Sequence, residues 1–144
     1  MTRRVVVEAT CADARDVVLV LGDPALAGAL AGRVGRVESG DALRSMAGLS
    51  VVVAHDWLRR RPPAAQRAFF LEAARVLPKR GLLVVGDVMW SLEPAQVDEP
   101  EQFGDAVGQA PTARSVEQWA RDAGFLPDLH RFGVGRAVLV ALRS

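Results

Sequence analysis

A strand that runs directly into a capped helix is the feature that most constrains how this 144-residue chain can fold. Residues 17–21 (VVLVL) are apolar throughout, and such a short apolar run is typical of a strand buried on both faces of a sheet. Gly22 ends the run, Asp23 stands where a helix N-cap is expected, and Pro24 takes the first helical position. Strand, tight turn and helix form the opening unit of a nucleotide-binding α/β fold, and equally the first unit of any other parallel sheet.

Strands and helices alternate along the rest of the chain. The alternation predicts a largely parallel sheet covered by helices, and the last two strands predict an antiparallel pair at the C-terminus. Residues 3–9 are expected to form a short edge strand, because charged residues flank them. Ser115 opens a helix with the S-x-x-Q form of a capping box, and residues 91–109 are expected to form a loop. The other predicted strands are residues 33–38, 50–54, 82–85, 125–132 and 137–142, and the other predicted helices are residues 24–32 and 64–77.

Composition bounds the class of protein. Half of the residues are hydrophobic and the formal net charge is +1, which predicts one globular domain over residues 1–144 without a strong field for an anionic membrane or nucleic acid. Nucleic acid is disfavoured by this charge but not excluded. The single cysteine, Cys11, cannot form an internal disulfide, and no Cys/His cluster has metal-ligand spacing, so no metal site is expected. Since no stretch reads as a signal peptide or a transmembrane helix, we expect a cytoplasmic protein.

Two stretches carry a resemblance to a known family. The run FFLEAARVLPKRGLLVVGDV at 69–88 and the run SVEQWARDAGFLPDLHRFGVGRAVLVALRS at 115–144 resemble the class I S-adenosylmethionine (SAM)-dependent methyltransferases. The first resembles that family's helix, R-x-L-K-P-G-G turn and fifth strand, and the second resembles its last helix and final antiparallel strand pair. The resemblance implies a Rossmann-like methyltransferase fold, whose sheet has seven strands with one reversed, and SAM as the cofactor.

The N-terminal third departs from the family's cofactor motif, which is roughly D-x-G-x-G-x-G. On that pattern Val20 takes the acidic position, Gly22 matches the first glycine, and Pro24 and Leu26 replace the next two. The glycines of such a turn permit positive φ and let a cofactor approach the backbone. Pro24 has no N–H to donate, and Leu26 is expected to place its side chain where the methionine part of SAM lies. Asp23 is expected to cap the helix itself, so the resemblance implies a degenerate cofactor site.

The chain is also shortened between the first helix and the strand at 50–54. Two alignments remain open for this segment. In the first alignment, Glu38 ends the family's second strand and holds the ribose hydroxyls. In the second, residues 33–43 form the third strand and Asp41 lies beside the adenine. Either residue is equally explained as a solvated turn carboxylate. Both alignments leave out at least one strand and one helix, which exposes a sheet edge and an apolar face. We therefore expect a homodimer, or a heterodimer with a complete methyltransferase, joined through this side, unless residues 3–9 cap the edge.

Further candidate residues follow the central strands. His55 comes at the C-terminal end of its strand, where open α/β sheets place ligands, and is a candidate general base or a non-catalytic histidine. Asp87 ends the next strand towards the same cleft. Trp57 and Trp90 are interpreted as an acceptor pocket or as core. The arginines at 59–61 are expected in a solvated loop, with contact to a phosphate-bearing acceptor or RNA as the alternative.

These observations leave two main hypotheses about function. The first is a methyltransferase-like protein with a degenerate cofactor site, unable to bind SAM in the usual way, that serves as a structural or regulatory partner. The alternative is a small active SAM-dependent methyltransferase on an unidentified acceptor. Another α/β module, such as a response-regulator-like domain, is disfavoured because no acidic phospho-acceptor cluster follows the first strand.

Overall fold

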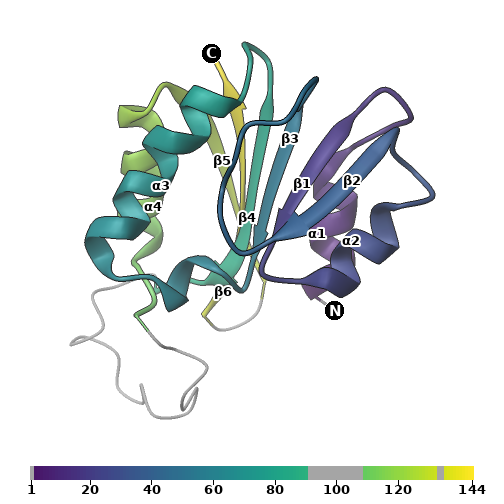
Figure 1. Ribbon diagram of the computed structural model, residues 1–144. Coiled ribbons are helices and arrows are strands. Elements are labelled where there is room, and N and C mark those ends of the chain that lie inside the picture. The colour runs from purple at the N-terminus through teal and green to yellow at the C-terminus, as the bar shows by residue number, and fades with distance from the viewer. Residues whose placement is uncertain (1, 91–108, 133–134) are drawn as a thin grey trace.

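A six-stranded sheet with the strand order β2-β1-β3-β4-β6-β5 forms the centre of the protein (Figure 1). The computed structural model describes residues 2–90, 109–132 and 135–144. Strands β1, β2, β3 and β4 are parallel to one another, whereas β6 is antiparallel to both β4 and β5. This confirms the predicted mostly parallel sheet with an antiparallel C-terminal pair. The strands are β1 (Val17–Leu21), β2 (Arg36–Gly40), β3 (Val51–His55), β4 (Leu82–Val88), β5 (Phe125–Arg131) and β6 (Arg136–Arg143).

Two helices cover each face of the sheet (Figure 1). On one face, Val6 and Leu30 pack against Val20 and Val53 of the central strands. On the other face, Phe70 packs with the alternate strand residues. Strand β1 therefore contributes to both cores, as its apolar sequence predicts. The helices are α1 (Thr2–Thr10) and α2 (Pro24–Leu30) on the first face, and α3 (Pro63–Val76) and α4 (Ala113–Asp122) on the second, with a short 3-10 helix at Leu58–Arg60.

The N-terminal segment differs from the prediction. Residues 3–9 are expected as an edge strand, but they form helix α1, which lies on a face of the sheet and does not cap its edge. Val6 and Thr10, four residues apart, are both buried, which is helical spacing. Gly86 of β4 permits the contact, because a Cβ at that position would lie 2.6 Å from Cγ2 of Val6. Burial of one helical side outweighed the strand propensity of three consecutive valines.

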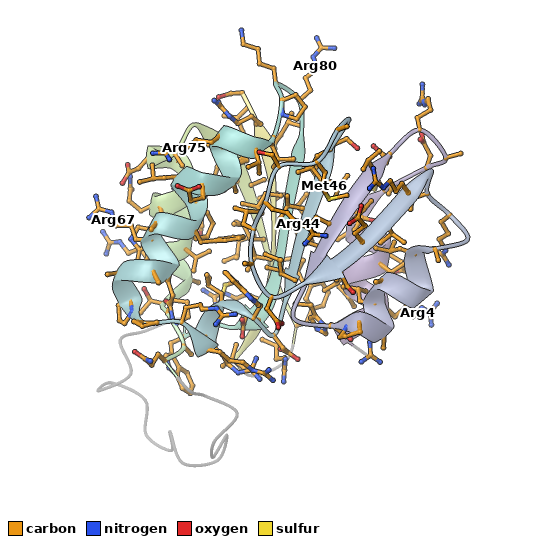
Figure 2. All side chains as sticks on the ribbon, viewed as in Figure 1. Arg4, Arg44, Met46, Arg67, Arg75 and Arg80 are labelled. Atoms are coloured by element: carbon orange, nitrogen blue, oxygen red, sulfur yellow. The ribbon has the colours of Figure 1, made fainter. Side chains whose placement is uncertain are left out.

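The shortened N-terminal half is covered by the chain's own loop. Strand β2 pairs directly with β1 and forms the edge of the sheet, so it takes the position of a second strand, and the alignment that makes residues 33–43 a third strand is wrong. Residues 41–50, all of them described, form neither helix nor strand. Leu43, Met46 and Leu49 of this loop pack on the core beneath it, and Figure 2 shows Met46 in front of the sheet. An extended loop therefore covers the face that the missing helix would otherwise cover.

The remaining helix boundaries follow local chemistry. Helix α4 begins at Ala113, because Oγ1 of Thr112 accepts a hydrogen bond from the backbone N–H of Ser115 at 3.1 Å. The cap predicted at Ser115 is therefore three residues too late. Gly124 has a φ of +94° and ends this helix as predicted. The loop predicted at 91–109 and the hairpin turn predicted at 133–135 lie largely outside the described residues.

Candidate functional site

Charged side chains gather where β1, β3 and β4 end. Asp23 follows β1, His55 and Asp56 end β3, and Asp87 lies near the end of β4. The carboxyl ends of parallel strands meet at one edge of a sheet, so these residues come together although they are distant in sequence. The structure divides them into two clusters, one around Asp23 and one around Asp87.

The carboxylate of Asp23 is the centre of the first cluster. Its Oδ1 accepts the backbone N–H groups of Ala25 at 3.1 Å and Leu26 at 3.3 Å, which caps α2 as predicted. Its Oδ2 lies 2.9 Å from Nε of Arg3 and 2.7 Å from Nδ1 of His55. Burial by itself would raise the pKa of Asp23, but the hydrogen bonds from Arg3, His55 and Leu26 outweigh it and hold that pKa below its ordinary value.

His55 is oriented by this carboxylate. A carboxylate only accepts hydrogen bonds, so Nδ1 of His55 carries the proton of the 2.7 Å contact with Asp23. Nε2 is buried, and no hydrogen-bond partner for it lies within the described part of the chain; the nearest carboxylate oxygen, Oδ2 of Asp56, is 3.8 Å away. An imidazole held through one nitrogen can act as a general base through the other, provided that an acceptor reaches the buried Nε2.

The second cluster is an ion-pair network that the sequence did not reveal. Nη1 of Arg59 lies 2.8 Å from Oδ1 of Asp87 and 2.7 Å from Oδ1 of Asp56, and Nη1 of Arg136 lies 2.8 Å from that same oxygen of Asp56. Asp87 has no exposed surface. Burial alone would lower the pKa of Arg59, but its pairing with Asp87 and Asp56 outweighs burial and leaves that pKa above its ordinary value. Burial alone would raise the pKa of Asp56, but Arg59 and the other positive neighbours bring it below its ordinary value.

The expectation of a solvated arginine loop is therefore wrong for Arg59, which is buried, and holds for Arg60, which is exposed. One sequence signal pointed to this difference. Arg59 stands three residues after Asp56, and that spacing brings opposite charges together on one helical turn.

The two candidate ribose and adenine acids lie in different surroundings. Glu38, on the edge strand, is paired with Arg44 at 2.8 Å and with Arg36, and the hydrogen bond from Arg44 is the main cause of its lowered pKa. The backbone oxygen of Asp41 accepts the indole N–H of Trp57 at 3.0 Å. Gly22 and Asp41 line one cavity of about 230 Å³, and Glu38 is not among its lining residues, which are Gly22, Asp23, Pro24, Ser39, Gly40 and Asp41.

The turn at Gly22 has a backbone shape that requires a glycine. Gly22 has a φ of +86°, which favours glycine. A Cβ built there would lie 2.7 Å from the backbone oxygen of His55 and 2.8 Å from Cβ of Trp57. The space on the Cβ side of the glycine is thus filled by the chain itself. The cavity that Gly22 lines has a volume of about 230 Å³, below the roughly 300–1,000 Å³ of ligand pockets.

Burial bears on two other expectations about side chains. Leu26 does not point to the cofactor side of the turn; it has no exposed surface and packs in the core beneath α1 and α2. Trp57 and Trp90 are both buried, and Trp57 packs against Phe69 with ring centroids 5.0 Å apart. The guanidinium of Arg61 lies 4.4 Å from the centre of the Trp57 ring, and both side chains line a separate cavity of about 380 Å³.

The described part of the chain holds neither a metal-binding group nor a membrane-spanning helix. Residues 2–90, 109–132 and 135–144 contain no group of three or more His, Cys, Asp or Glu residues that could hold a metal ion. No helix in those same ranges is long and apolar enough to span a bilayer. Cys11 is an exposed free thiol.

Comparison with solved structures places the fold among methyltransferases. No family model and no curated protein sequence matches the chain. A putative methyltransferase from Bacillus halodurans superposes with a TM-score of 0.77 at 14% identity, covering 98% of this chain and 97% of the other. Human N-acetylserotonin methyltransferase, solved in complex with SAM, superposes with a TM-score of 0.76 at 12% identity over 100% of this chain. The chain spans 52% of that human chain, and 55% of an O-methyltransferase family protein from Burkholderia thailandensis.

A third neighbour comes from an assembly of two proteins. It is a chain of the complex between the Haloferax volcanii Trm112 methyltransferase activator and a putative methyltransferase, with a TM-score of 0.72, 13% identity, and coverage of 99% of this chain and 88% of the other. Identities this low establish the fold alone. The protein therefore has the class I SAM-dependent methyltransferase fold, in a form whose sheet has six strands.

Proposed function

We propose that this protein is a methyltransferase-fold protein that does not bind SAM in the usual way and acts as a structural or regulatory partner of another protein. The observation that carries the proposal is the small space at the turn, because the cavity that Gly22 lines has a volume of about 230 Å³, below the roughly 300–1,000 Å³ of ligand pockets.

The start of helix α2 supports the same proposal. An anion or ribose at a helix N-terminus uses the free N–H groups of the first turn. Here Asp23 already accepts two of them, from Ala25 and Leu26, and Pro24 has none to offer. The donor set that would meet a cofactor is therefore largely satisfied within the chain.

Thermal unfolding with and without ligand tests the proposal. A genuine site at 100 times its Kd adds about 2.7 kcal/mol to the free energy of unfolding. For a domain of this size that amounts to roughly 6–11 °C in Tm. We expect the Tm to stay unchanged in millimolar SAM or S-adenosylhomocysteine, while a SAM-binding methyltransferase in the same buffer shifts. A saturable rise in Tm would contradict the proposal.

The outer edge of β2 is the proposed contact with the partner. This strand pairs with β1 on one side, and within the described residues no strand pairs with its other side. Open edges are ready sites for pairing with another chain. The partner is a second copy or a complete methyltransferase, and the activator complex of the Haloferax neighbour is a precedent for a fold of this kind in an assembly. Sedimentation that shows a monomer at every concentration would remove the homodimer and leave the heterodimer.

A small active SAM-dependent methyltransferase is the second candidate. The observation in its favour is the pair formed by Asp23 and His55, because an oriented imidazole at the C-terminal ends of the strands could remove a proton from an acceptor hydroxyl or amine. The ligand titration described above separates the two candidates, since this one requires SAM to bind.

A further inference from the structure

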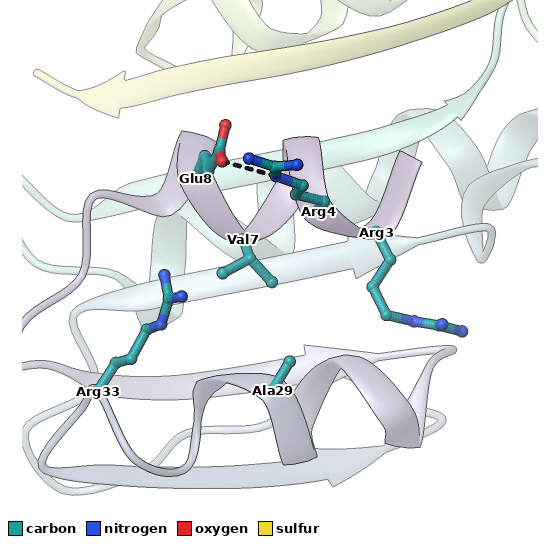
Figure 3. A pocket seen from close by; sticks show the side chains of 6 residues that line it. All are labelled: Arg3, Arg4, Val7, Glu8, Ala29 and Arg33. Carbon is teal, nitrogen blue, oxygen red and sulfur yellow. Dashed lines mark hydrogen bonds and ion pairs between the residues drawn. The ribbon is translucent and has the colours of Figure 1, made fainter. Parts of the chain in front are cut away.

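A second cavity lies between helices α1 and α2, on the outer side of the layer that they form (Figure 3). Its volume is about 530 Å³, within the range of roughly 300–1,000 Å³ found for small-molecule sites. It shares only one residue, Arg3, with the contacts of the cluster around Asp23. The lining residues are Arg3, Arg4, Val7, Glu8, Ala29 and Arg33.

The groove carries an excess of positive charge. Three guanidinium groups line it against a single carboxylate, that of Glu8. Arg4 and Glu8 form a pair at 3.1 Å, and their side chains are 85% and 62% exposed, so this pair is weak. The side chain of Arg33 is exposed and makes no hydrogen bond or ion pair with any described residue. Arg33 is therefore available to an anion from solution.

The cationic groups stand at the two ends of an apolar floor. Arg3 contacts Asp23, the residue just before α2, and so lies at the start of that helix. Arg33 lies just beyond its end. Val7 and Ala29 lie between them (Figure 3). A seven-residue helix is about 10 Å long, so an occupant that meets both ends must be elongated.

We propose that this groove binds a small organic dianion, with one phosphate or carboxylate group on Arg33, the other on Arg3 and Arg4, and an apolar middle over Val7 and Ala29. Guanidinium groups recognise both acids through paired, charge-assisted hydrogen bonds. The inference is independent of the proposed function, because it uses neither the turn at Gly22 nor an interface with a partner.

Arg3 couples the groove to the first cluster. An anion that binds Arg3 competes with Asp23 for the same guanidinium, whose side chain is 52% exposed. Since Asp23 also holds Nδ1 of His55, occupancy of the groove is expected to change the environment of that imidazole. The NMR signals of His55 therefore give a readout at a distance from the groove.

The test is a calorimetric titration of the full chain with suberate, sebacate and inorganic phosphate as probes. We expect saturable binding of at least one of the two elongated dianions, and weaker binding of inorganic phosphate. Arg33→Ala should weaken that binding about tenfold, the loss of one charge-assisted contact. Arg67→Ala is the matched control, because Arg67 is exposed on α3, points away from the groove and has no partner in the described residues (Figure 2).

Three results would overturn the inference. These are no saturable binding of any probe by the wild-type protein, equal weakening by Arg33→Ala and Arg67→Ala, and binding of inorganic phosphate as tight as that of the dianions. The His55 signals should move with the bound dianion in the wild type and move clearly less in the Arg33→Ala protein at the same subsaturating concentration. Both variants change exposed side chains and are expected to fold normally.

Discussion

Nδ1 of His55 lies 2.7 Å from Oδ2 of Asp23, across 32 residues of sequence. This contact joins the end of β3 to the N-cap of α2, and Arg3 adds helix α1 to the same carboxylate. One acidic side chain therefore caps a helix, orients a histidine and anchors the N-terminal helix. It does so at the turn where a methyltransferase of this fold would receive its cofactor.

Substitution of Asp23 separates the cap from the charge. Asp23→Ala loses both, and we expect the free energy of unfolding to fall by about 1–3 kcal/mol, because the cap alone contributes about 0.5–2 kcal/mol. Asp23→Asn keeps an oxygen that can accept the N–H groups of α2, so its loss should be clearly smaller. Urea denaturation of both variants measures the difference, and equal losses would show that the cap adds nothing.

The turn at Gly22 should not tolerate a side chain. Gly22→Ala forces a positive φ on a residue with a Cβ and brings that Cβ within 2.8 Å of His55 and Trp57, so we expect a loss of at least about 2 kcal/mol. Gly28→Ala is the matched control, because nothing lies within 4 Å of a Cβ at this position in α2. There we expect a gain of about 0.5–1 kcal/mol. Similar unfolding midpoints for the two variants would contradict this description of the turn.

The buried network predicts a large effect for one arginine and almost none for its neighbour. Arg59→Ala leaves Asp87 buried and without its arginine, which should cost about 3–5 kcal/mol. Arg60→Ala changes an exposed side chain and should stay within about 0.5 kcal/mol of the wild type. The double variant Arg59→Met with Asp87→Leu should recover much of the loss, and failure to recover would mean that the charges themselves are needed.

Acid should destabilise the protein through Asp23 and Asp56. Both have a pKa in the folded state below the ordinary value of 3.8, so the folded state binds fewer protons than the unfolded state as pH falls. Their contribution is complete above that value and is lost progressively below it. Unfolding midpoints measured between about pH 5 and pH 2 should fall steeply. Asp56→Asn should flatten that fall, and an unchanged slope would exclude Asp56 as its source.

The sequence was most informative where local chemistry and burial agree. The sequence predicted three local features correctly: the buried strand β1, the tight turn at Gly22 and the helix N-cap at Asp23. The antiparallel pairing of β5 and β6 was also predicted correctly. In these elements the preferences of neighbouring residues are enough to define the backbone.

Contacts between distant segments were the part that could not be predicted. Helix α1 depends on the close approach of Val6 to Gly86. The loop 41–50 depends on the packing of its apolar residues against the core. Neither contact produces a pattern in the local sequence. Arg59 is buried beside Asp87, which lies near the end of β4, a strand that begins more than twenty residues later in the sequence. Trp57 was recognised as core or pocket, but its closure of the turn at Gly22 needed the register of β1 against β3.

The most direct test of the central claim is an NMR titration of the labelled protein with S-adenosylhomocysteine, followed at the backbone amides of Gly22, Ser39, Gly40 and Asp41, which line the cavity at the turn. If the turn is filled as described, these signals stay in place at millimolar ligand. Saturable shifts centred on Gly22 would contradict the account and favour the active methyltransferase.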